Sequence, residues 1–150
     1  MLLGLFETGR GLLLVAGPIV LAVRIVLWLL PSPTILKGVR RLSAVRARET
    51  RSPRPSVERL TWAVEAVSRR IPKATCLTQA LSAQLLLRQF GYDSRLCLGV
   101  ARSPRGEFRA HAWLEHDGSI VIGGAEAAAV FTRLPALGAS DRATSGFGPA

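Results

Sequence analysis

Residues 72–81 read PKATCLTQAL, and this stretch decides what kind of fold the chain adopts. An apolar helix is predicted to begin near Thr75–Cys76 and to be stopped by Gly91. Cys76 then lies in the first turn, where free N–H groups and the positive end of the helix dipole favour a thiolate over a thiol. The same backbone donors are suited to binding an oxyanion. A buried structural cysteine is the alternative interpretation.

A second informative stretch, RAHAWLEHDG, begins at Arg109. Alternation along a strand places Arg109, His111, Trp113 and Glu115 on one face, with an alanine on each side of His111. A cysteine that opens a helix, followed by a histidine on a strand, is the order used by papain-like and transglutaminase-like enzymes, which form thioesters with a histidine-assisted thiolate. A lone histidine with satisfied hydrogen bonds is the alternative. His116 is next to a turn and is expected to be solvated, so it is the poorer candidate.

The remaining pattern predicts two helices followed by an antiparallel meander of three strands, which is an α+β arrangement. Ser56 is expected to cap the first of these helices and Pro72 to end it. Asp117-Gly118 is a strong signal for a two-residue hairpin turn. The strands are expected at residues 94–101, 107–116 and 119–124.

The N-terminal segment GLLLVAGPIVLAVRIVLWLL (residues 11–30) is apolar, and its only charge is Arg24. Its length meets the minimum for crossing the hydrocarbon core of a bilayer. Against this, a charge near the middle costs about 2.5–3.5 kcal/mol on insertion, and Gly17-Pro18 would bend or break the helix. No small-residue cleavage site follows, so a cleaved signal peptide fits poorly. Two interpretations stay open: a membrane-associated helical hairpin, or a buried helix packed on the domain or on a partner.

The chain carries a net charge of +10, and eighteen of its twenty basic residues are arginine. Six arginines fall between Arg40 and Arg54. Such a cluster suits nucleic acid, an acidic peptide or the cytoplasmic face of a membrane. The aromatic residues do not interleave with the arginines, and the sequence contains no recognisable nucleic-acid-binding motif. A nucleic-acid partner is therefore not expected.

The length of 150 residues suits one domain with a real core. Cys76 and Cys97 are too few for a disulfide framework or a structural zinc site, so we expect a reducing compartment, with Cys97 packed in a strand. The expected organisation is an apolar helical segment over residues 1–42, a basic linker over 43–56, a catalytic domain over 57–137 and a loose tail over 138–150.

Two longer segments, ATCLTQALSAQLLLRQFGYDSRLCLGVA (residues 74–101) and AHAWLEHDGSIVIGG (residues 110–124), resemble one family. They are similar to the transglutaminase-like cysteine peptidases of lasso-peptide biosynthesis, the peptidase half of the lasso maturation B protein. That family has a Cys-Leu pair opening a helix, a glycine turn, a Leu-x-x-Gly-Val strand, and Ala-His-Ala-Trp-x-Glu before another glycine turn. The matching residues here are Cys76-Leu77, Gly91, Leu96 to Val100, Ala110 to Glu115, and Gly118. The apolar N-terminus followed by Leu30-Pro31 also looks like standalone members of the family.

The resemblance implies a papain-like or transglutaminase-like fold, in which a catalytic helix packs on a small antiparallel sheet and N-terminal helices precede both. It implies a cysteine peptidase that removes the leader of a ribosomally made precursor, with Cys76 as the nucleophile and His111 as the general base. The implied partners are the precursor peptide, a separate small leader-binding protein and an ATP-dependent lasso cyclase. No cofactor or metal is implied. The expected location is the cytoplasm, with membrane association through residues 11–30 left open.

The third catalytic residue departs from the family pattern. The family places an aspartate about where Gly123-Gly124 stand, and no carboxylate occupies those positions. Glu126 is the candidate that could reach back, because Asp117 fits a turn former and Glu115 a residue on the strand surface. A backbone carbonyl, or a Cys-His dyad alone, could do a weaker version of the same task.

Two other functions compete with proteolysis. An acyl-transferring or crosslinking enzyme would use the same cysteine on the same fold, because a fold does not fix the acceptor. A non-catalytic scaffold of the maturation complex is favoured by the missing aspartate and disfavoured by the retained Cys76 and His111.

Overall fold

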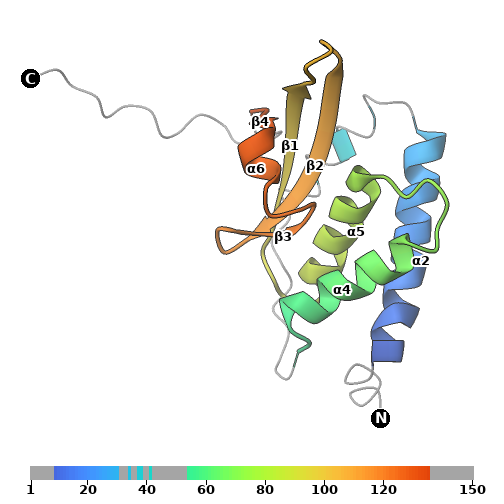
Figure 1. Cartoon of the computed structure of the whole chain (residues 1–150). Coiled ribbons are helices and arrows are strands. Elements are labelled where there is room, and N and C mark those ends of the chain that lie inside the picture. The colour runs from blue at the N-terminus through green and yellow to red at the C-terminus, as the bar shows by residue number, and fades with distance from the viewer. Residues whose placement is uncertain (1–8, 31–33, 35–36, 39–40, 42–53, 136–150) are drawn as a thin grey trace, which may run out of the picture.

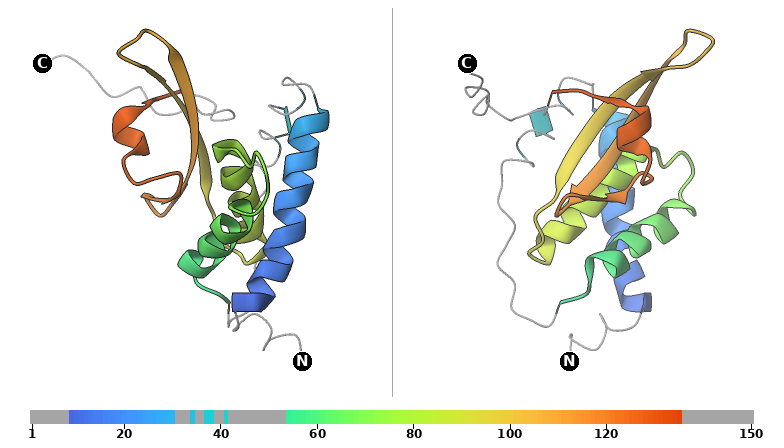
Figure 2. Two further views of the ribbon diagram at one scale, coloured as in Figure 1. Left: turned by 45° about the vertical axis from the view of Figure 1, so that its right-hand side comes forward. Right: turned by 60° about the vertical axis from the view of Figure 1, so that its left-hand side comes forward.

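The computed structural model describes residues 9–30, 34, 37–38, 41 and 54–135 (Figure 1). Two longer helices lie on one face of a four-stranded antiparallel sheet, a third longer helix packs outside those two, and one short helix lies on the other face (Figure 2). This arrangement confirms the predicted α+β class. The helices are α2 (Gly9–Leu29), α4 (Val57–Ser68), α5 (Cys76–Gln89) and the short α6 (Ala127–Val130).

Helix α2 is formed by the apolar N-terminal segment and packs against α4 and α5. Its buried side chains Leu12, Ala16, Val20 and Val23 recur every three or four residues, so they line one side of the helix. The helix continues through Pro18, so of the two expected effects, a bend or a break, the break does not occur. One face of this segment is thus built into the domain, as the buried-helix interpretation requires.

Helix α4 starts where the sequence predicts and ends earlier than expected. The hydroxyl of Ser56 accepts a hydrogen bond from the N–H of Arg59 (3.4 Å), which caps the first turn. The helix ends at Ser68, before Pro72 is reached. The reason is local, because Ile71 N–H bonds to the Ser68 carbonyl three residues back and tightens the chain into a turn.

Helix α5 begins at Cys76, with Thr75 as its cap, and ends at Gln89. Gly91 follows with a φ of +78°, the left-handed conformation that commonly ends helices. Side-chain contacts of Arg54 and Tyr92 join this end of α5 to the segment before α4. The guanidinium of Arg54 donates to the Gly91 carbonyl (3.0 Å) and lies over the ring of Tyr92, whose hydroxyl donates to the Pro55 carbonyl (2.9 Å).

The sheet has the strand order β3-β2-β1-β4, and every neighbouring pair is antiparallel. The predicted meander is confirmed, with Asp117 and Gly118 at positive φ in the hairpin turn. The short β4 and the helix α6 before it were not predicted. The strands are β1 (Arg95–Arg102), β2 (Phe108–His116), β3 (Ser119–Ile122) and β4 (Thr132–Arg133).

The two faces of the sheet bury different clusters. Ala112, Leu114 and Ile122 join the main core with apolar residues of α2, α4 and α5. On the other face, Trp113 and Cys97 pack with Ala127 of α6. The strand β2 therefore contributes to both layers, through alternate side chains.

Parts of the predicted organisation lie outside the described residues. These are residues 43–53 of the basic linker, most of residues 31–42, and the tail at 138–150. Those expectations stay predictions.

Candidate active site

Cys76 is the first residue of α5, and its thiol is half-buried and free. The Thr75 hydroxyl accepts from Thr78 N–H (3.3 Å), and the Thr75 carbonyl accepts from Gln79 N–H (3.0 Å). The N–H groups of Cys76 and Leu77 have no acceptor among the described residues. Two donors of the first turn thus stay available beside the thiol for an oxygen that gains negative charge.

The His111 ring is held by a backbone carbonyl. Its Nε2 atom lies 2.7 Å from the Gly123 oxygen, just past the end of β3. A carbonyl oxygen can only accept, so Nε2 carries the proton and donates it. In the neutral ring, Nδ1 then keeps its lone pair and is the nitrogen able to take a proton from a thiol.

Aromatic residues pack along the His111 ring. The Phe131 ring is stacked on it with centroids 4.9 Å apart, and Trp113 lies parallel at 6.4 Å. Across the ladder, Gly99 of β1 is paired with His111 and adds no side chain. A Cβ atom at Gly99 would lie 2.8 Å from both Phe131 and Trp113, so the aromatic packing requires a glycine there.

Gly123 is also required by geometry. Its φ is +107°, and a Cβ atom there would lie 2.6 Å from the Trp113 Cβ. Only glycine combines that backbone conformation with this close approach. The family pattern places an aspartate here, and this chain instead presents the backbone carbonyl of Gly123 to His111.

Glu126 is exposed and stands just before α6, where its side chain makes no capping hydrogen bond. Its Oε1 atom lies 3.0 Å from the place that a Cβ of Gly124 would occupy. The carboxylate is thus close to the residue after Gly123, while the hydrogen bond of the His111 ring goes to the Gly123 carbonyl. Its role as the third catalytic residue stays a prediction.

The Glu115 carboxylate bonds to both Trp113 and Arg133. It accepts a hydrogen bond from Trp113 Nε1 (3.0 Å) and forms an ion pair with Arg133 of β4. Burial alone would raise the pKa of Glu115, but the hydrogen bond from Trp113 and the charge of Arg133 outweigh it and lower that pKa. The expectation of a simple surface residue is wrong here. Phe131 and Arg133 carry no motif, and sequence reasoning missed both.

The two cysteines differ in surroundings. Cys97 is 3% exposed and packs against Trp113. Burial raises the pKa of its thiol to about 11, and the nearby Glu115 charge adds to the effect. Cys97 is therefore a protonated packing residue, as expected from the sequence, and Cys76 is the thiol available for chemistry.

The poorer candidate, His116, has a structural role. His116, expected to be solvated, is largely buried, and its Nδ1 atom lies 2.5 Å from the Asp93 carbonyl, so that expectation is wrong. It ties the β2–β3 hairpin to the chain before β1. Gln84 is buried and donates to the Ser94 carbonyl (3.4 Å), whereas Gln79 is half-buried on the cysteine helix.

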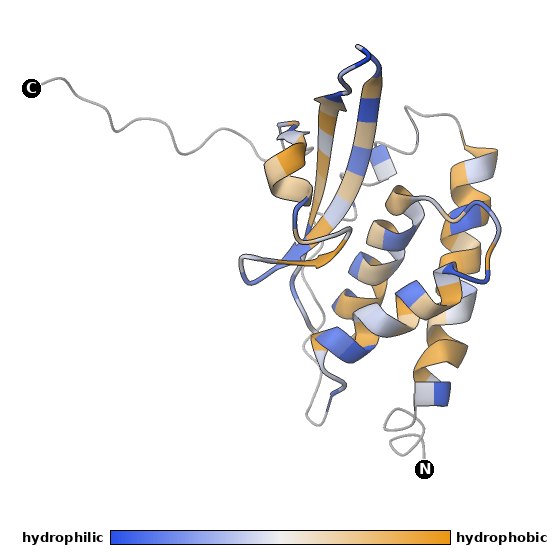
Figure 3. Ribbon diagram, in the orientation of Figure 1, coloured by the Kyte–Doolittle hydropathy of each residue, from blue (hydrophilic) through white to orange (hydrophobic). Residues whose placement is uncertain are grey.

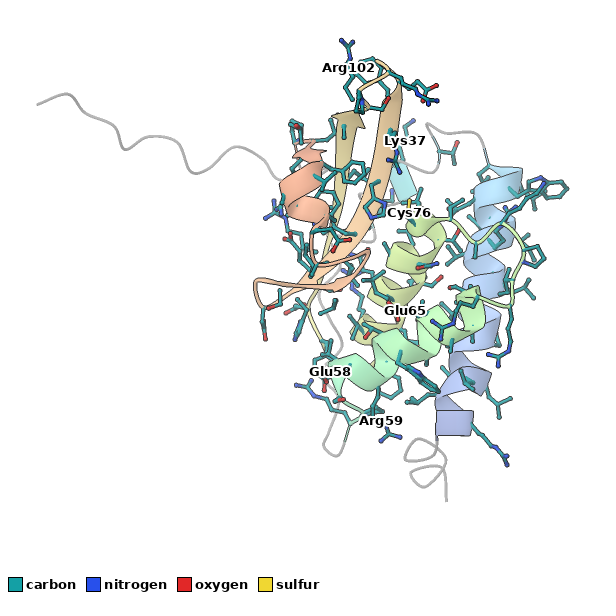
Figure 4. The ribbon with its side chains drawn as sticks, in the orientation of Figure 1. Lys37, Glu58, Arg59, Glu65, Cys76 and Arg102 are labelled. Atoms are coloured by element: carbon teal, nitrogen blue, oxygen red, sulfur yellow. The ribbon has the colours of Figure 1, made fainter. Side chains whose placement is uncertain are left out.

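The structure brings the elements that carry Cys76 and His111 together. Helix α5 packs against β2, and Figure 4 shows Cys76 at the end of α5 beside that strand. The Cys76 thiol makes no hydrogen bond with a described residue. Hydrogen bonds between catalytic groups are often long in a free enzyme and tighten when substrate binds. Within the described ranges, no group of three His, Cys, Asp or Glu residues is placed to hold a metal ion.

Comparison with known proteins gives one match. The profile of the transglutaminase-like superfamily matches residues 19–136, which is more than half of the chain. The match begins inside α2 and includes α4, α5 and the whole sheet. No curated protein and no solved structure matches.

Proposed function

This chain belongs to the transglutaminase-like superfamily, and we propose that it is a cysteine peptidase that removes the leader from a ribosomally made lasso-peptide precursor. The observation that carries the proposal is that α5, which opens with a free thiol, packs against β2, which bears a histidine whose Nε2 donates to the Gly123 carbonyl. The Cys-Leu and Ala-His-Ala-Trp-x-Glu segments support the choice of lasso-peptide maturation within the superfamily.

The proposed reaction has two halves, formation of a thioester on Cys76 and its hydrolysis, and His111 transfers protons in both. His111 Nδ1 takes the proton of the Cys76 thiol, and the sulfur attacks the carbonyl carbon of the scissile bond. The N–H groups of Cys76 and Leu77 stabilise the oxyanion that forms. The C–N bond breaks as His111 returns its proton to the leaving amine, which is the new N-terminus of the core peptide.

Hydrolysis of the thioester completes the cycle. His111 takes a proton from water, the hydroxide attacks the thioester carbonyl, and the leader leaves with a free carboxylate while the Cys76 thiol is regenerated. Glu126 is proposed as a supporting charge. From its place beside Gly124, its carboxylate would favour the imidazolium without a direct hydrogen bond.

The proposed partners follow from the proposed reaction. The precursor is delivered by a small leader-binding protein, and the freed amine passes to an ATP-dependent lasso cyclase. A net charge of +10 suits an acidic leader or an acidic face on the delivery protein. Because the two cysteines are free, a cytoplasmic location fits the chain.

Two rival functions are supported by particular features. Acyl transfer to an amine would use the same thioester and differ only in the acceptor. A scaffold without activity is favoured because no carboxylate among the described residues is hydrogen-bonded to the His111 ring.

The deciding experiment is mass spectrometry of a lasso-type precursor incubated with its leader-binding protein and the full-length chain. We expect cleavage at one site, loss of cleavage with Cys76→Ala and His111→Ala, and retention with Cys97→Ala, the matched control for removing a thiol. Glu126→Gln is expected to slow cleavage by about tenfold or less, because the carboxylate is exposed and screened.

The other outcomes identify the rivals. Cleavage that survives Cys76→Ala contradicts the assignment of the nucleophile. A product carrying an added amine in place of a hydrolysed bond identifies the acyl transferase. If the chain shows no turnover, and Cys76 forms no covalent adduct with a substrate-like electrophile, the result supports the non-catalytic scaffold.

A further inference from the structure

Helix α2 is apolar on both sides, and only one side is covered. Its sole ionisable residues are Arg10 and Arg24. The side opposite the core is exposed over its whole length, and Figure 3 shows hydrophobic residues along most of the helix. The exposed apolar residues, here called the outer face of α2, are Leu14 (69% exposed), Leu21 (51%), Ile25 (45%), Val26 (48%), Trp28 (75%), Leu29 (65%) and, just after the helix, Leu30 (40%).

The outer face is one continuous stripe. Leu14, Leu21, Ile25 and Trp28 are separated by seven, four and three residues, so they lie on the same side of the helix. From Leu14 to Trp28 the stripe is about 21 Å long at 1.5 Å per residue. Isolated exposed apolar residues need no explanation, but a continuous stripe on a helix marks an interaction surface.

The helix has the length and composition of a membrane span, yet its inner side belongs to the fold. Leu12, Ala16 and Val20 are fully buried against α4 and α5. A transmembrane position would require these contacts to be broken, or the polar surfaces of α4 to enter the hydrocarbon core. An orientation with the helix axis parallel to the bilayer keeps the core intact and buries the outer face alone.

The charge distribution selects the occupant of this face. Between residues 8 and 57 the sequence has nine basic residues and a single acid, Glu49. Two copies of so basic a region repel each other, whereas an anionic surface attracts it. A basic cluster next to an apolar helix is the combination that binds anionic lipid headgroups.

We propose that the outer face of α2 docks in the plane of an anionic membrane, with its apolar side chains at the boundary between headgroups and acyl chains. Trp28, the most exposed residue of this face, sits at that boundary, where tryptophan is favoured. The basic stretch that follows in the sequence, residues 37–51, adds positive charge that an anionic surface attracts. The domain is thereby held at the membrane surface.

The first test is co-sedimentation of the full-length chain with vesicles. Vesicles of phosphatidylcholine with phosphatidylglycerol are expected to bind the protein at least tenfold better than vesicles of phosphatidylcholine alone. The variant I25E/W28E is expected to lose at least tenfold in partitioning, while circular dichroism and thermal unfolding stay unchanged because both side chains are exposed. Phe108→Glu is the matched control, because Phe108 is an equally exposed aromatic residue (73%) on β2, and it is expected to bind like wild type.

The orientation is tested with a tryptophan in the middle of the stripe. Trp62 and Trp113 remain in a Trp28→Phe background, so the signal of Leu21→Trp is taken as the difference from Trp28→Phe alone. This difference signal is expected to be quenched more by lipids brominated near the headgroups than by lipids brominated deep in the acyl chains. Stronger quenching by the deep bromine would mean that α2 spans the bilayer, which overturns the proposal.

Three other results would also overturn the proposal. The first two are absence of binding to anionic vesicles and undiminished binding by I25E/W28E. The third is a dimer that forms without lipid and dissociates in this variant, which would assign the outer face of α2 to a second copy of the chain. None of these variants touches Cys76 or His111, so cleavage of a soluble precursor reports on the proposed peptidase independently.

Discussion

The two faces of β2 are packed by different chemistry. Toward α5, Ala112 and Leu114 enter a mainly apolar core that three helices help to build. The face toward α6 carries His111, Trp113 and Glu115. The His111 ring is hydrogen-bonded to the Gly123 carbonyl and stacks with Phe131 and Trp113. Glu115 accepts from Trp113 Nε1 and forms an ion pair with Arg133. The first face can be satisfied by many apolar combinations of the right volume, whereas the second depends on particular atoms at particular places. Stability should therefore depend mainly on the apolar face, and the orientation of His111 on the other.

The largest effect on stability is expected from the apolar face. Leu114 is completely buried, so Leu114→Ala leaves a cavity and should lower the free energy of unfolding by about 2–5 kcal/mol. Urea unfolding measures this loss, and Leu134→Ala is the matched control because Leu134 is 41% exposed. The folded fraction of Leu114→Ala should keep most of its kcat/KM. A hundredfold loss of kcat/KM per folded molecule would contradict the division between the two faces.

The next-largest effect is expected at Gly123, where activity should fall more than stability does. Gly123→Ala introduces backbone strain of about 1–3 kcal/mol and a clash with Trp113, which displaces the carbonyl from His111. A shift of about 1 Å at such a site can cost a hundredfold in rate, and we expect a loss of that order in precursor cleavage.

The control for this variant is Gly118→Ala. Gly118 also has positive φ (+78°), but nothing lies within 4 Å of its Cβ position, so the strain comes without the displacement. It should lose stability and keep its activity. Equal loss of activity in both variants would show that strain alone, and not the carbonyl, accounts for the effect.

A smaller effect, dependent on pH, is expected from Glu115. Its pKa is lowered in the folded protein, so its contribution to stability is present above the unfolded value near 4.5 and is lost as pH falls below it. Glu115→Gln should cost about 1.5 kcal/mol in the free energy of unfolding at pH 7. Urea unfolding of both proteins at pH 7 and pH 3.5 should show the difference shrinking in acid. A difference that stays constant across this range would argue against the ion pair as its source.

The smallest effect is expected from chemical probing of Cys97. Because burial raises the pKa of its thiol to about 11, iodoacetamide at pH 8 should leave Cys97 unmodified in the folded protein. Peptide mass spectrometry should find the label on the half-buried Cys76, and on both cysteines after unfolding in urea. Rapid labelling of Cys97 before unfolding would mean that the α6 face opens readily.

Features set by neighbouring residues were predictable from the sequence. The start of α5 at Thr75–Cys76, its end before Gly91 and the hairpin at Asp117-Gly118 depend on local backbone preferences. The alternation around His111 also predicted which side chains share its face.

Features set by distant residues were not predictable. The sequence left a backbone carbonyl open as a partner for His111, but it did not indicate which one. The acceptor is the Gly123 carbonyl, twelve residues away, and its position depends on the packing of Gly123 against Trp113. The strand β4 has two residues, too few for any periodic signal, yet it supplies Arg133 to Glu115. His116 Nδ1 is hydrogen-bonded to the Asp93 carbonyl, twenty-three residues earlier in the chain.

The Gly123 carbonyl has a consequence for how the site tolerates change. An aspartate in this role can be deleted by one substitution and loses its charge in acid. A peptide oxygen belongs to every amino acid, so no exchange of side chains removes it, and it does not titrate in the range where the protein is folded. A survey of the site by alanine substitutions would thus find a nucleophile and a base directly, and would detect the orienting carbonyl only indirectly, at Gly123→Ala, where the added Cβ displaces the backbone.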